Sequence, residues 1–207
     1  MILGKSYIEQ AITQGLWTYH SYLDNQEPRI GQNSVDVRLA PFFLVPQKMP
    51  DGHVVDPYKP CTLPEYREVE ALYYDLKPRE FILGSASERI DCTAMLPEKW
   101  FAHYDPRYRN SAVDRGVAFC QHYDGRSTMA RLGILSHVSA GYGDYGFKGA
   151  FTLEIVNLSP NTIRLRSNMR IGQIYFTEIA GGGYDLYKGY DQTDFKPVAP
   201  IVGRDRF

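Results

Sequence analysis

The stretch GRSTMARLGILSHVSAGYGDYGFKGAFTLE, residues 125–154, gathers side chains that could do chemistry. It opens on a turn with one arginine and two hydroxyls, Arg126, Ser127 and Thr128. A guanidinium binds phosphate oxygens bidentately, and consecutive turn N–H groups form an anion-binding nest. The turn therefore indicates a phosphate site, although a turn with a solvated arginine would have the same residues.

Asp144 lies among four glycines in the segment SAGYGDYGFKG, residues 139–149. Glycine lets a backbone approach a ligand closely, and an aspartate held there can accept a hydrogen bond from a sugar hydroxyl or orient a water. A hairpin turn with aspartate as its turn former is the alternative.

Glu154 occurs in the strand-like run 149–158. Leu153 and Ile155 share one face of such a strand, so Glu154 points to the other face. In a pocket near Arg131, a glutamate could take a proton from water and pass it on. The alternative is an ordinary solvent-facing strand glutamate.

Motifs for metal-assisted or nucleotide-loop chemistry do not occur in the chain. None of the five histidines stands in an HxE motif and no PCxxC follows, which excludes the zinc-dependent nucleotide deaminases. Any deamination would be metal-free at the base. There is no phosphate loop, dinucleotide fingerprint or nucleophile elbow. Cys61, Cys92 and Cys120 form no CxxC pair, which predicts three buried or half-buried thiols.

Length and composition are typical of one globular domain with a sizeable core, because the chain has 207 residues, 43% of them hydrophobic. The net charge of −1 argues against nucleic acid or an anionic membrane as partner. No apolar run reaches the roughly 18 residues of a membrane span, and the N-terminus lacks a signal-peptide layout. We expect a cytoplasmic protein.

One helix is predicted near the N-terminus, within residues 4–18. Ile8, Ile12 and Leu16 recur every four residues, and Ser6 is a candidate N-cap because Glu9 follows three residues later. Almost no helical pattern follows residue 75.

Strands are predicted where short apolar runs alternate between Gly, Pro, Asn and Asp clusters. The clearest is 34–46, and the others are 79–90, 136–142, 149–158, 161–168 and 171–180. This is the pattern of a mainly antiparallel β domain, a sandwich or jelly-roll relative.

Two segments fall outside this pattern. Residues 98–124 carry many charges and aromatic rings, which predicts a surface excursion with a helical turn at 110–116. The tail 181–207 is Gly-rich and then polar, which predicts a mobile arm of the kind that folds over a ligand or a neighbouring subunit.

Five blocks, in order, resemble the trimeric dCTP deaminases, which share a superfamily with the dUTPases. The blocks span most of the chain. They are MILGKSYIEQAITQG (1–15), RIGQNSVDVRL (29–39), KPREFILGSASERIDCTAMLP (77–97), GRSTMARLGILSHVSAGYGDYGFKGAFTLEIVN (125–157) and MRIGQIYF (169–176).

The resemblance implies a distorted jelly-roll or β-barrel of the dUTPase-like type with a short N-terminal helix, assembled as a homotrimer with active sites between subunits. It implies Mg²⁺ carried by the nucleotide triphosphate, no zinc, and no metal ligand from the protein. Residues 1–207 would then be a single domain, with a surface insertion around 98–122 and an arm from about residue 181.

The resemblance also assigns substrate contacts. Arg126, Ser127 and Thr128 match the turn that contacts the triphosphate, and Ser127 also helps to position water. Gln173 matches a glutamine in the next strand. Lys188, in the segment YKGYDQ, is the best candidate for a phosphate contact from the tail.

The catalytic roles follow in the same way. Glu154 matches the general acid/base, with Arg131 beside it. The backbone carbonyl of Ala140 matches an acceptor for the attacking water and the amino group. Tyr142 lies near the nucleotide. Asp144 matches the aspartate that binds the deoxyribose 3′-hydroxyl and, in bifunctional members, activates water against the α-phosphate.

The implied activity is hydrolysis of dCTP to dUTP and ammonia in pyrimidine deoxynucleotide metabolism. Glu154 decides for deamination, because plain dUTPases lack a glutamate at its position, and the aromatic residue before Asp144 favours the bifunctional members that continue to dUMP and diphosphate. A dUTPase with little deaminase activity and a non-catalytic nucleotide-binding trimer remain alternatives. Gly143 stands where the family has isoleucine, which predicts a loosened position beside the sugar site.

Overall fold

The computed structural model describes residues 1–23, 26–109, 116–180, 185–189 and 194–200. It is mainly β, with a short N-terminal helix α1 (Lys5–Thr13) and a second short helix α2 (Ser127–Arg131). Three single 3₁₀ turns lie at Pro60–Thr62, Glu98–Trp100 and Pro106–Tyr108. In the part of the chain described, no helix is long and apolar enough to span a membrane. The predicted fold class is confirmed as far as its β content and N-terminal helix.

Two larger antiparallel sheets make up the body, and two strand pairs join them. The four-stranded sheet has the order β10-β8-β13-β2 and the five-stranded sheet the order β4-β3-β6-β11-β9, while β1 pairs with β7 and β12 with β5. The strand bounds are β1 Thr18–Ser21, β2 Val35–Arg38, β3 Phe42–Pro46, β4 Tyr66–Glu70, β5 Tyr73–Leu76, β6 Phe81–Ser85, β7 Glu88–Asp91, β8 Phe119–Gly125, β9 Ile134–Leu135, β10 Tyr142–Gly143, β11 Thr152–Asn157, β12 Ile163–Arg166 and β13 Arg170–Glu178.

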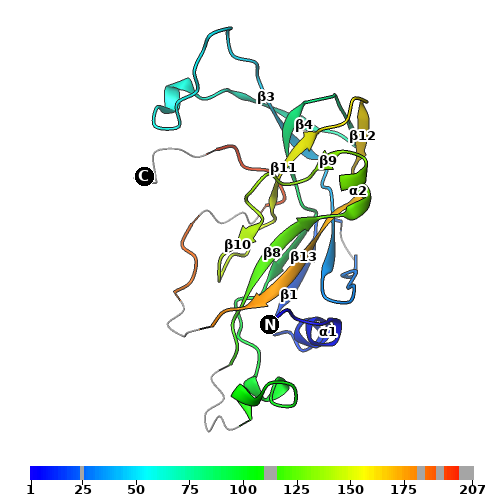
Figure 1. Cartoon of the computed structure of the whole chain (residues 1–207), viewed down its shortest axis with the longest axis vertical. Helices are drawn as coiled ribbons and strands as arrows, with labels where there is room; N and C mark the ends of the chain where they lie inside the picture. The colour runs from blue at the N-terminus through cyan, green and yellow to red at the C-terminus, as the bar shows by residue number, and fades with distance from the viewer. Residues whose placement is uncertain (24–25, 110–115, 181–184, 190–193, 201–207) are drawn as a thin grey trace.

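The expected barrel does not close among the described residues. The two larger sheets stay separate, and each keeps its edge strands. Figure 1 shows β8 and β13 running side by side through the lower half of the molecule, with β3, β4 and β11 above them. At short breaks in the strands the chain leaves one sheet and continues in another. The sheets therefore share one core without forming one continuous ladder.

The predicted strand 34–46 shows such a break. Val35 and Val37 are buried while Asp36 and Arg38 are only half-buried, as the alternation predicts. The ladder stops before Pro41, which has no N–H to donate. The first half becomes β2 in one sheet and the second half becomes β3 in the other.

The predicted strand 79–90 divides in the same way, into β6 and β7. The predicted strand 136–142 is wrong over most of its length, since only Tyr142 enters a ladder, opposite His122. Its N–H groups at Val138 and Ser139 bond instead to the Glu154 carboxylate. The side chain of Glu154, on β11, thus accepts the hydrogen bonds that a neighbouring strand would accept in a ladder.

Helix α1 confirms the predicted helix but is shorter, ending before Gly15, which has φ +69°. Ser6 is not the N-cap. Gly4 takes that position, and no side chain caps the helix. The N–H of Lys5 donates instead to the Gln32 carbonyl at 2.7 Å, so a neighbouring loop provides the acceptor.

The core is one continuous cluster of side chains drawn from both sheets and α1. Its largest fully buried members are Trp17, Phe43, Phe101, Phe119 and Phe176. Cys92 and Cys120 are buried as predicted, but Cys61 is exposed, because it lies in the long β3–β4 connection that projects from the body at the top of Figure 1. The prediction of a buried or half-buried thiol at Cys61 is wrong.

The segment predicted as a surface insertion, 98–122, is not wholly at the surface. Phe101 is fully buried, and the chain enters β8 at Phe119, next to β13 in the middle of the four-stranded sheet. The expected helical turn at 110–116 lies almost entirely outside the described residues. That the segment is an insertion relative to the family stays a prediction, as does the single domain over 1–207.

The described part of the predicted arm lies against the body. The Val198 N–H donates to Thr152 Oγ1 at 3.1 Å, and the Ser85 hydroxyl donates to the Phe195 carbonyl. Pro197 is buried. These contacts bring residues 194–200 next to β6 and β11, which is the side of the molecule that carries Glu154.

Candidate active site

The predicted site residues divide between two cavities in one chain. The first, the Arg126 cleft, has a volume of about 620 Å³ and includes Arg126, Ser127 and Gln173 in its lining. The second, the Glu154 pocket, has a volume of about 430 Å³ and includes Glu154, Ala140 and Tyr142. The residues predicted to bind phosphate and those predicted to transfer protons thus lie in different cavities of the same chain.

Arg126 is held at the mouth of its cleft by an ion pair. It stands immediately before α2, and its backbone N–H donates to the Ile171 carbonyl on β13. Its guanidinium Nη1 donates to Asp36 Oδ1 on β2 at 2.6 Å. The side chain is 28% exposed, so it keeps donors available to a ligand after binding Asp36.

A row of polar residues crosses three adjacent strands beside Arg126. Gln173 on β13 lies opposite Asp36 on β2 and opposite Asp124 on β8. Ser34 donates to Gln173 Oε1 at 3.1 Å, which orients the amide. All of these residues line the Arg126 cleft. The pairing of β2, β13 and β8 sets the spacing of these side chains, so the cleft is lined by hydrogen-bonding groups at fixed separations.

Glu154 lies on β11 between the buried residues Leu153 and Ile155, and its own side chain is half-buried. The alternation predicted from the sequence is therefore confirmed. The carboxylate Oε2 accepts the N–H of Val138 at 2.9 Å and of Ser139 at 3.2 Å. Among the described residues, no hydrogen bond is formed by Oε1. The carboxylate is fixed by two backbone donors and keeps one oxygen for a ligand.

The lining of the Glu154 pocket is mostly apolar and aromatic around that carboxylate. Beside the predicted Ala140 and Tyr142, it is formed by Leu83, Phe147, Phe151, Thr152, Tyr187, Val198, Ala199 and Pro200. A mostly apolar cavity with few polar groups suits a nucleobase or a sugar ring better than a phosphate. Residues from the tail form part of the wall.

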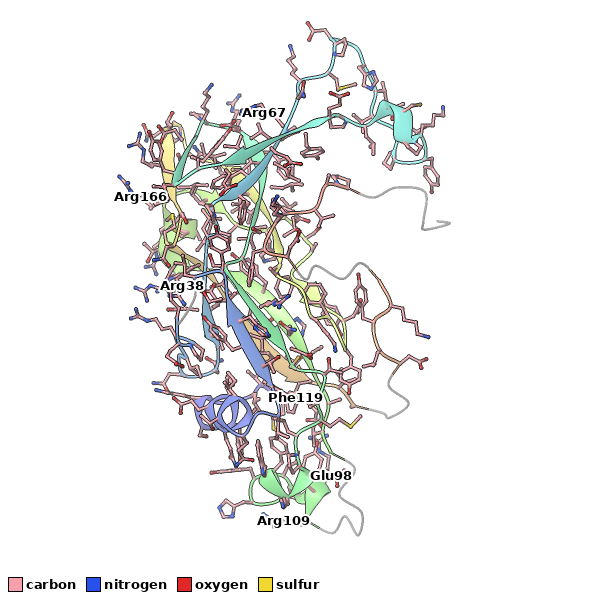
Figure 2. All side chains as sticks on the ribbon, turned by 180° about the vertical axis from the view of Figure 1, so that it is seen from behind. Arg38, Arg67, Glu98, Arg109, Phe119 and Arg166 are labelled. Carbon is pink, nitrogen blue, oxygen red and sulfur yellow. The ribbon has the colours of Figure 1, made fainter. Side chains whose placement is uncertain are left out.

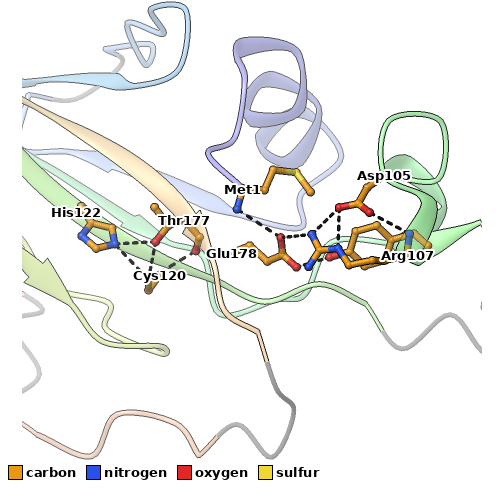
Figure 3. A network of polar contacts seen from close by, with 8 residues as sticks. Met1, Asp105, Arg107, Cys120, His122, Thr177 and Glu178 are labelled. Atoms are coloured by element: carbon orange, nitrogen blue, oxygen red, sulfur yellow. Dashed lines mark hydrogen bonds and ion pairs between the residues drawn. The ribbon is translucent and has the colours of Figure 1, made fainter.

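Tyr142 is supported from behind by a small polar cluster, part of which is drawn in Figure 3. Its ring meets His122 edge-on at 4.9 Å, and His122 Nε2 lies 2.7 Å from Thr177 Oγ1. A hydrogen bond with the Cys120 thiol, together with burial, raises the pKa of Tyr142 to about 12. Burial lowers the pKa of His122. Tyr142 is therefore a neutral phenol at physiological pH.

Asp144 is exposed and lines a third cavity of about 340 Å³ together with Tyr142 and Asp185. The loop that carries Asp144 is tied to the body on its far side. Tyr145 donates to the Thr93 carbonyl at 2.8 Å. Tyr142 lines both this cavity and the Glu154 pocket, so the two cavities are neighbours.

Gly143 lies in a tightly packed position, in contrast to the loosened one predicted from the missing isoleucine. A Cβ at Gly143 would lie 3.1 Å from Phe151, 3.2 Å from Phe147 and 3.3 Å from Gln121. The two phenylalanine rings occupy the space that a larger side chain would need. Glycine at this position, which has no side chain, leaves room for the rings of Phe147 and Phe151 in the pocket wall.

Three predicted residues are not brought into these cavities. Thr128 and Arg131 are exposed on α2, and Lys188 is exposed in the described part of the tail. Within the described residues, no ion pair joins Arg131 to Glu154. The roles predicted for the three stay predictions.

Asp36 is a residue of the candidate site that the sequence did not single out. It forms an ion pair with Arg126 and lines the same cleft. The alternation itself carried a signal, since Asp36 points away from the buried Val35 and Val37. The sequence could not show which arginine pairs with Asp36, because Arg126 lies 90 positions further along the chain.

A family model described as dCTP deaminase-like matches residues 112–179. A protein named "dCTP deaminase, dUMP-forming" from Methanoregula boonei is 32% identical over 89% of this chain and 87% of its own length. The chain belongs to the dCTP deaminase family.

One further relative agrees with this assignment, and one solved structure shows the same fold. A "dCTP deaminase" from Natronomonas pharaonis is 30% identical over 86% of this chain and 81% of its own length. The crystal structure of 2′-deoxycytidine 5′-triphosphate deaminase from Agrobacterium tumefaciens shares the fold, with a TM-score of 0.52 and 20% identity. That match covers 84% of this chain and 47% of the other.

Proposed function

We propose that this dCTP deaminase family member hydrolyses dCTP to dUTP and ammonia, with the base in the Glu154 pocket. The observation that carries the proposal is the carboxylate of Glu154, which two backbone N–H groups hold in a mostly apolar pocket with one oxygen left over. The names of the relatives support dCTP as the substrate.

The chemistry needs one group that moves protons between water and cytosine. Glu154 takes a proton from water as the water oxygen bonds to C4, and the proton goes to N3. A second proton transfer to the amino group lets the C4–N bond break, and ammonia leaves. The Ala140 carbonyl, in the same pocket, accepts a hydrogen bond from the attacking water.

Metal ions have a limited part in this proposal. The described residues contain no cluster of three His, Cys, Asp or Glu side chains that could hold one, and the proton transfers above need no zinc. In the Arg126 cleft, Asp36 is already engaged by arginines. Mg²⁺ is proposed there as an ion carried by the triphosphate, where it would neutralise phosphate charge.

The active site is proposed to form between subunits of a homotrimer. The support is the division of the predicted residues between the Arg126 cleft and the Glu154 pocket, with Arg131 exposed and unpaired with Glu154 in its own chain. In the trimer, Arg126, Ser127 and Arg131 of one chain would face Glu154 of the next. Thr128, Gln173 and Lys188 would add phosphate contacts.

Product analysis tests the activity. Incubating the protein with dCTP and Mg²⁺ should give a uracil nucleotide and ammonia. Glu154→Gln should slow deamination by about a thousandfold, because an amide keeps the shape but cannot take a proton. Its affinity for dCTP should stay within about threefold of the wild type, since the amide still fits the pocket. Glu70→Gln, an exposed strand glutamate on β4, is the matched control.

Unchanged dCTP from the wild type, or full activity in Glu154→Gln, would overturn the proposal. Conversion of dUTP to dUMP and diphosphate, with dCTP left unchanged, would identify a dUTPase instead. Tight nucleotide binding without any turnover would identify a non-catalytic binding protein.

The second step, from dUTP to dUMP and diphosphate, is supported by the relatives named as dUMP-forming. We assign it to Asp144, which is exposed next to the Glu154 pocket and could activate water against the α-phosphate. Asp144→Asn should then accumulate dUTP where the wild type releases dUMP. Equal dUMP yields from both would remove Asp144 from this role.

A further inference from the structure

A second arginine-lined cavity lies on the other side of Asp36, and the proposed reaction does not use it. This Arg29 pocket has a volume of about 200 Å³ and is lined by Arg29, Asp36, Arg38, Asn168 and Arg170. Figure 2 shows Arg38 on the same flank of the molecule as Arg166, where several nitrogen-tipped side chains point outward.

Asp36 cannot neutralise the arginines around it. Its carboxylate lies 2.6 Å from Arg126 and 3.1 Å from Arg170, and Arg29 approaches to 3.5 Å. One carboxylate therefore faces three guanidiniums. The side chains of Arg170 and Arg29 are 40% and 66% exposed, so both can turn donors toward the pocket.

Arg38 adds a fourth guanidinium, but its charge is balanced. Glu88, with no exposed side-chain surface, accepts the Arg38 Nε–H at 2.5 Å and the Arg38 backbone N–H at 2.7 Å. The pocket itself is lined by three guanidiniums, those of Arg29, Arg38 and Arg170. Against the carboxylates of Asp36 and Glu88 they leave a formal excess of one positive charge, and Arg126 on the other side of Asp36 adds to it. Within one small cavity, such an excess favours an anion.

A neutral hydrogen-bonding group completes the pocket wall. Asn168 has φ +65°, in the left-handed region that asparagine tolerates better than most residues, and it forms the turn that leads into β13. Its side-chain amide adds donors beside the guanidiniums. Planar donor groups of this kind match the oxygens of a phosphate.

We infer that the Arg29 pocket binds a phosphate-type oxyanion, of the size of inorganic phosphate or diphosphate. A volume of about 200 Å³ is below the roughly 300 Å³ at which pockets for larger organic ligands begin, so the pocket suits a small anion better than a nucleoside. The bound anion is held by Arg29 and Arg170, which leaves the Asp36 carboxylate to Arg126. The site is independent of the proposed deamination.

Calorimetric titration of the full-length chain tests this site, with inorganic phosphate in one series and diphosphate in another, without nucleotide or Mg²⁺. We expect two anions per chain, one in the Arg126 cleft and one in the Arg29 pocket. Arg29→Gln should weaken the second by about tenfold, as expected for charge-assisted hydrogen bonds, and Arg126→Gln should leave it in place. The series with the tighter binding identifies the ligand size.

Arg107→Gln is the matched control, because Arg107 is similarly exposed, at 58%, and is paired with Asp105 and Glu178 elsewhere on the molecule, as Figure 3 shows. It should titrate as the wild type does. Binding in Arg29→Gln equal to that of the wild type would overturn the inference, as would the loss of all anion binding in Arg126→Gln. Circular dichroism of each variant confirms that the fold is kept.

Discussion

The Arg126 cleft and the Glu154 pocket hold their functional groups in different ways. In the cleft, neighbouring strands of one sheet set the spacing of Asp36, Gln173 and Asp124, and an ion pair fixes Arg126. In the pocket, Glu154 comes from a strand, but its hydrogen-bond donors come from a loop and part of the wall comes from the tail. The cleft is therefore as stable as its sheet, while the pocket can change locally.

The largest expected effect is on the sheet behind the cleft. Glu88→Gln should lower the free energy of unfolding by about 3 kcal/mol, because it leaves Arg38, only 16% exposed, without its charged partner next to Asp36. Urea denaturation measures this. Asp75→Asn, which breaks the exposed pair with Arg164, should cause no measurable change. Equal stability of the two variants would show that the buried Arg38–Glu88 pair does not stabilise β2, the strand that carries Asp36.

The second effect separates binding from chemistry. Arg126→Gln should weaken dCTP binding about a hundredfold, because a charge-assisted phosphate contact is lost and Asp36 loses its shortest partner. Titration of dCTP measures it, with Glu154→Gln as the comparison that keeps binding. Weaker binding in Glu154→Gln than in Arg126→Gln would reverse the assigned roles of the two cavities.

A smaller effect is expected from the tail. Phe195→Ala should lower kcat/KM about tenfold with little loss of stability, since the ring contacts Tyr22 and Arg89 and keeps residues 198–200 at the pocket wall. Steady-state kinetics and limited proteolysis measure the two quantities. Val54→Ala, an exposed position on the β3–β4 connection, is the control. Unaltered kinetics in Phe195→Ala would remove the tail from the pocket.

The smallest effect concerns the loop that carries Asp144. Although burial opposes it, hydrogen bonds from Thr93 and Lys148 hold the pKa of Asp91 below its ordinary value. The pair with Lys148 therefore adds stability above pH of about 4, and this is lost as the pH falls through the lowered pKa. Asp91→Asn should be about 0.5 kcal/mol less stable at pH 7 and equal to the wild type in strong acid. A difference that persists in acid would point to another cause.

The strands and the charged residues of the site could be predicted because both are local properties. Alternation placed Glu154 opposite the buried face of its strand, and this placement is correct. The N-cap at Ser6 and the strand at 136–142 were wrong for a common reason. In both cases a distant group, the Gln32 carbonyl or the Glu154 carboxylate, satisfies a backbone N–H that local rules assign elsewhere.

By itself, the sequence determined the family, the mainly β fold and the types of side chain available for phosphate and proton chemistry. Periodicity and ordered motifs depend on residues close together along the chain, so they can be read without coordinates. Only the tertiary structure decided that Asp36 holds Arg126 across 90 residues, that Gly143 makes room for Phe147 and Phe151, and that the tail forms a wall of the Glu154 pocket. Such contacts join distant segments, and their geometry exists only once both sheets have packed around the shared core.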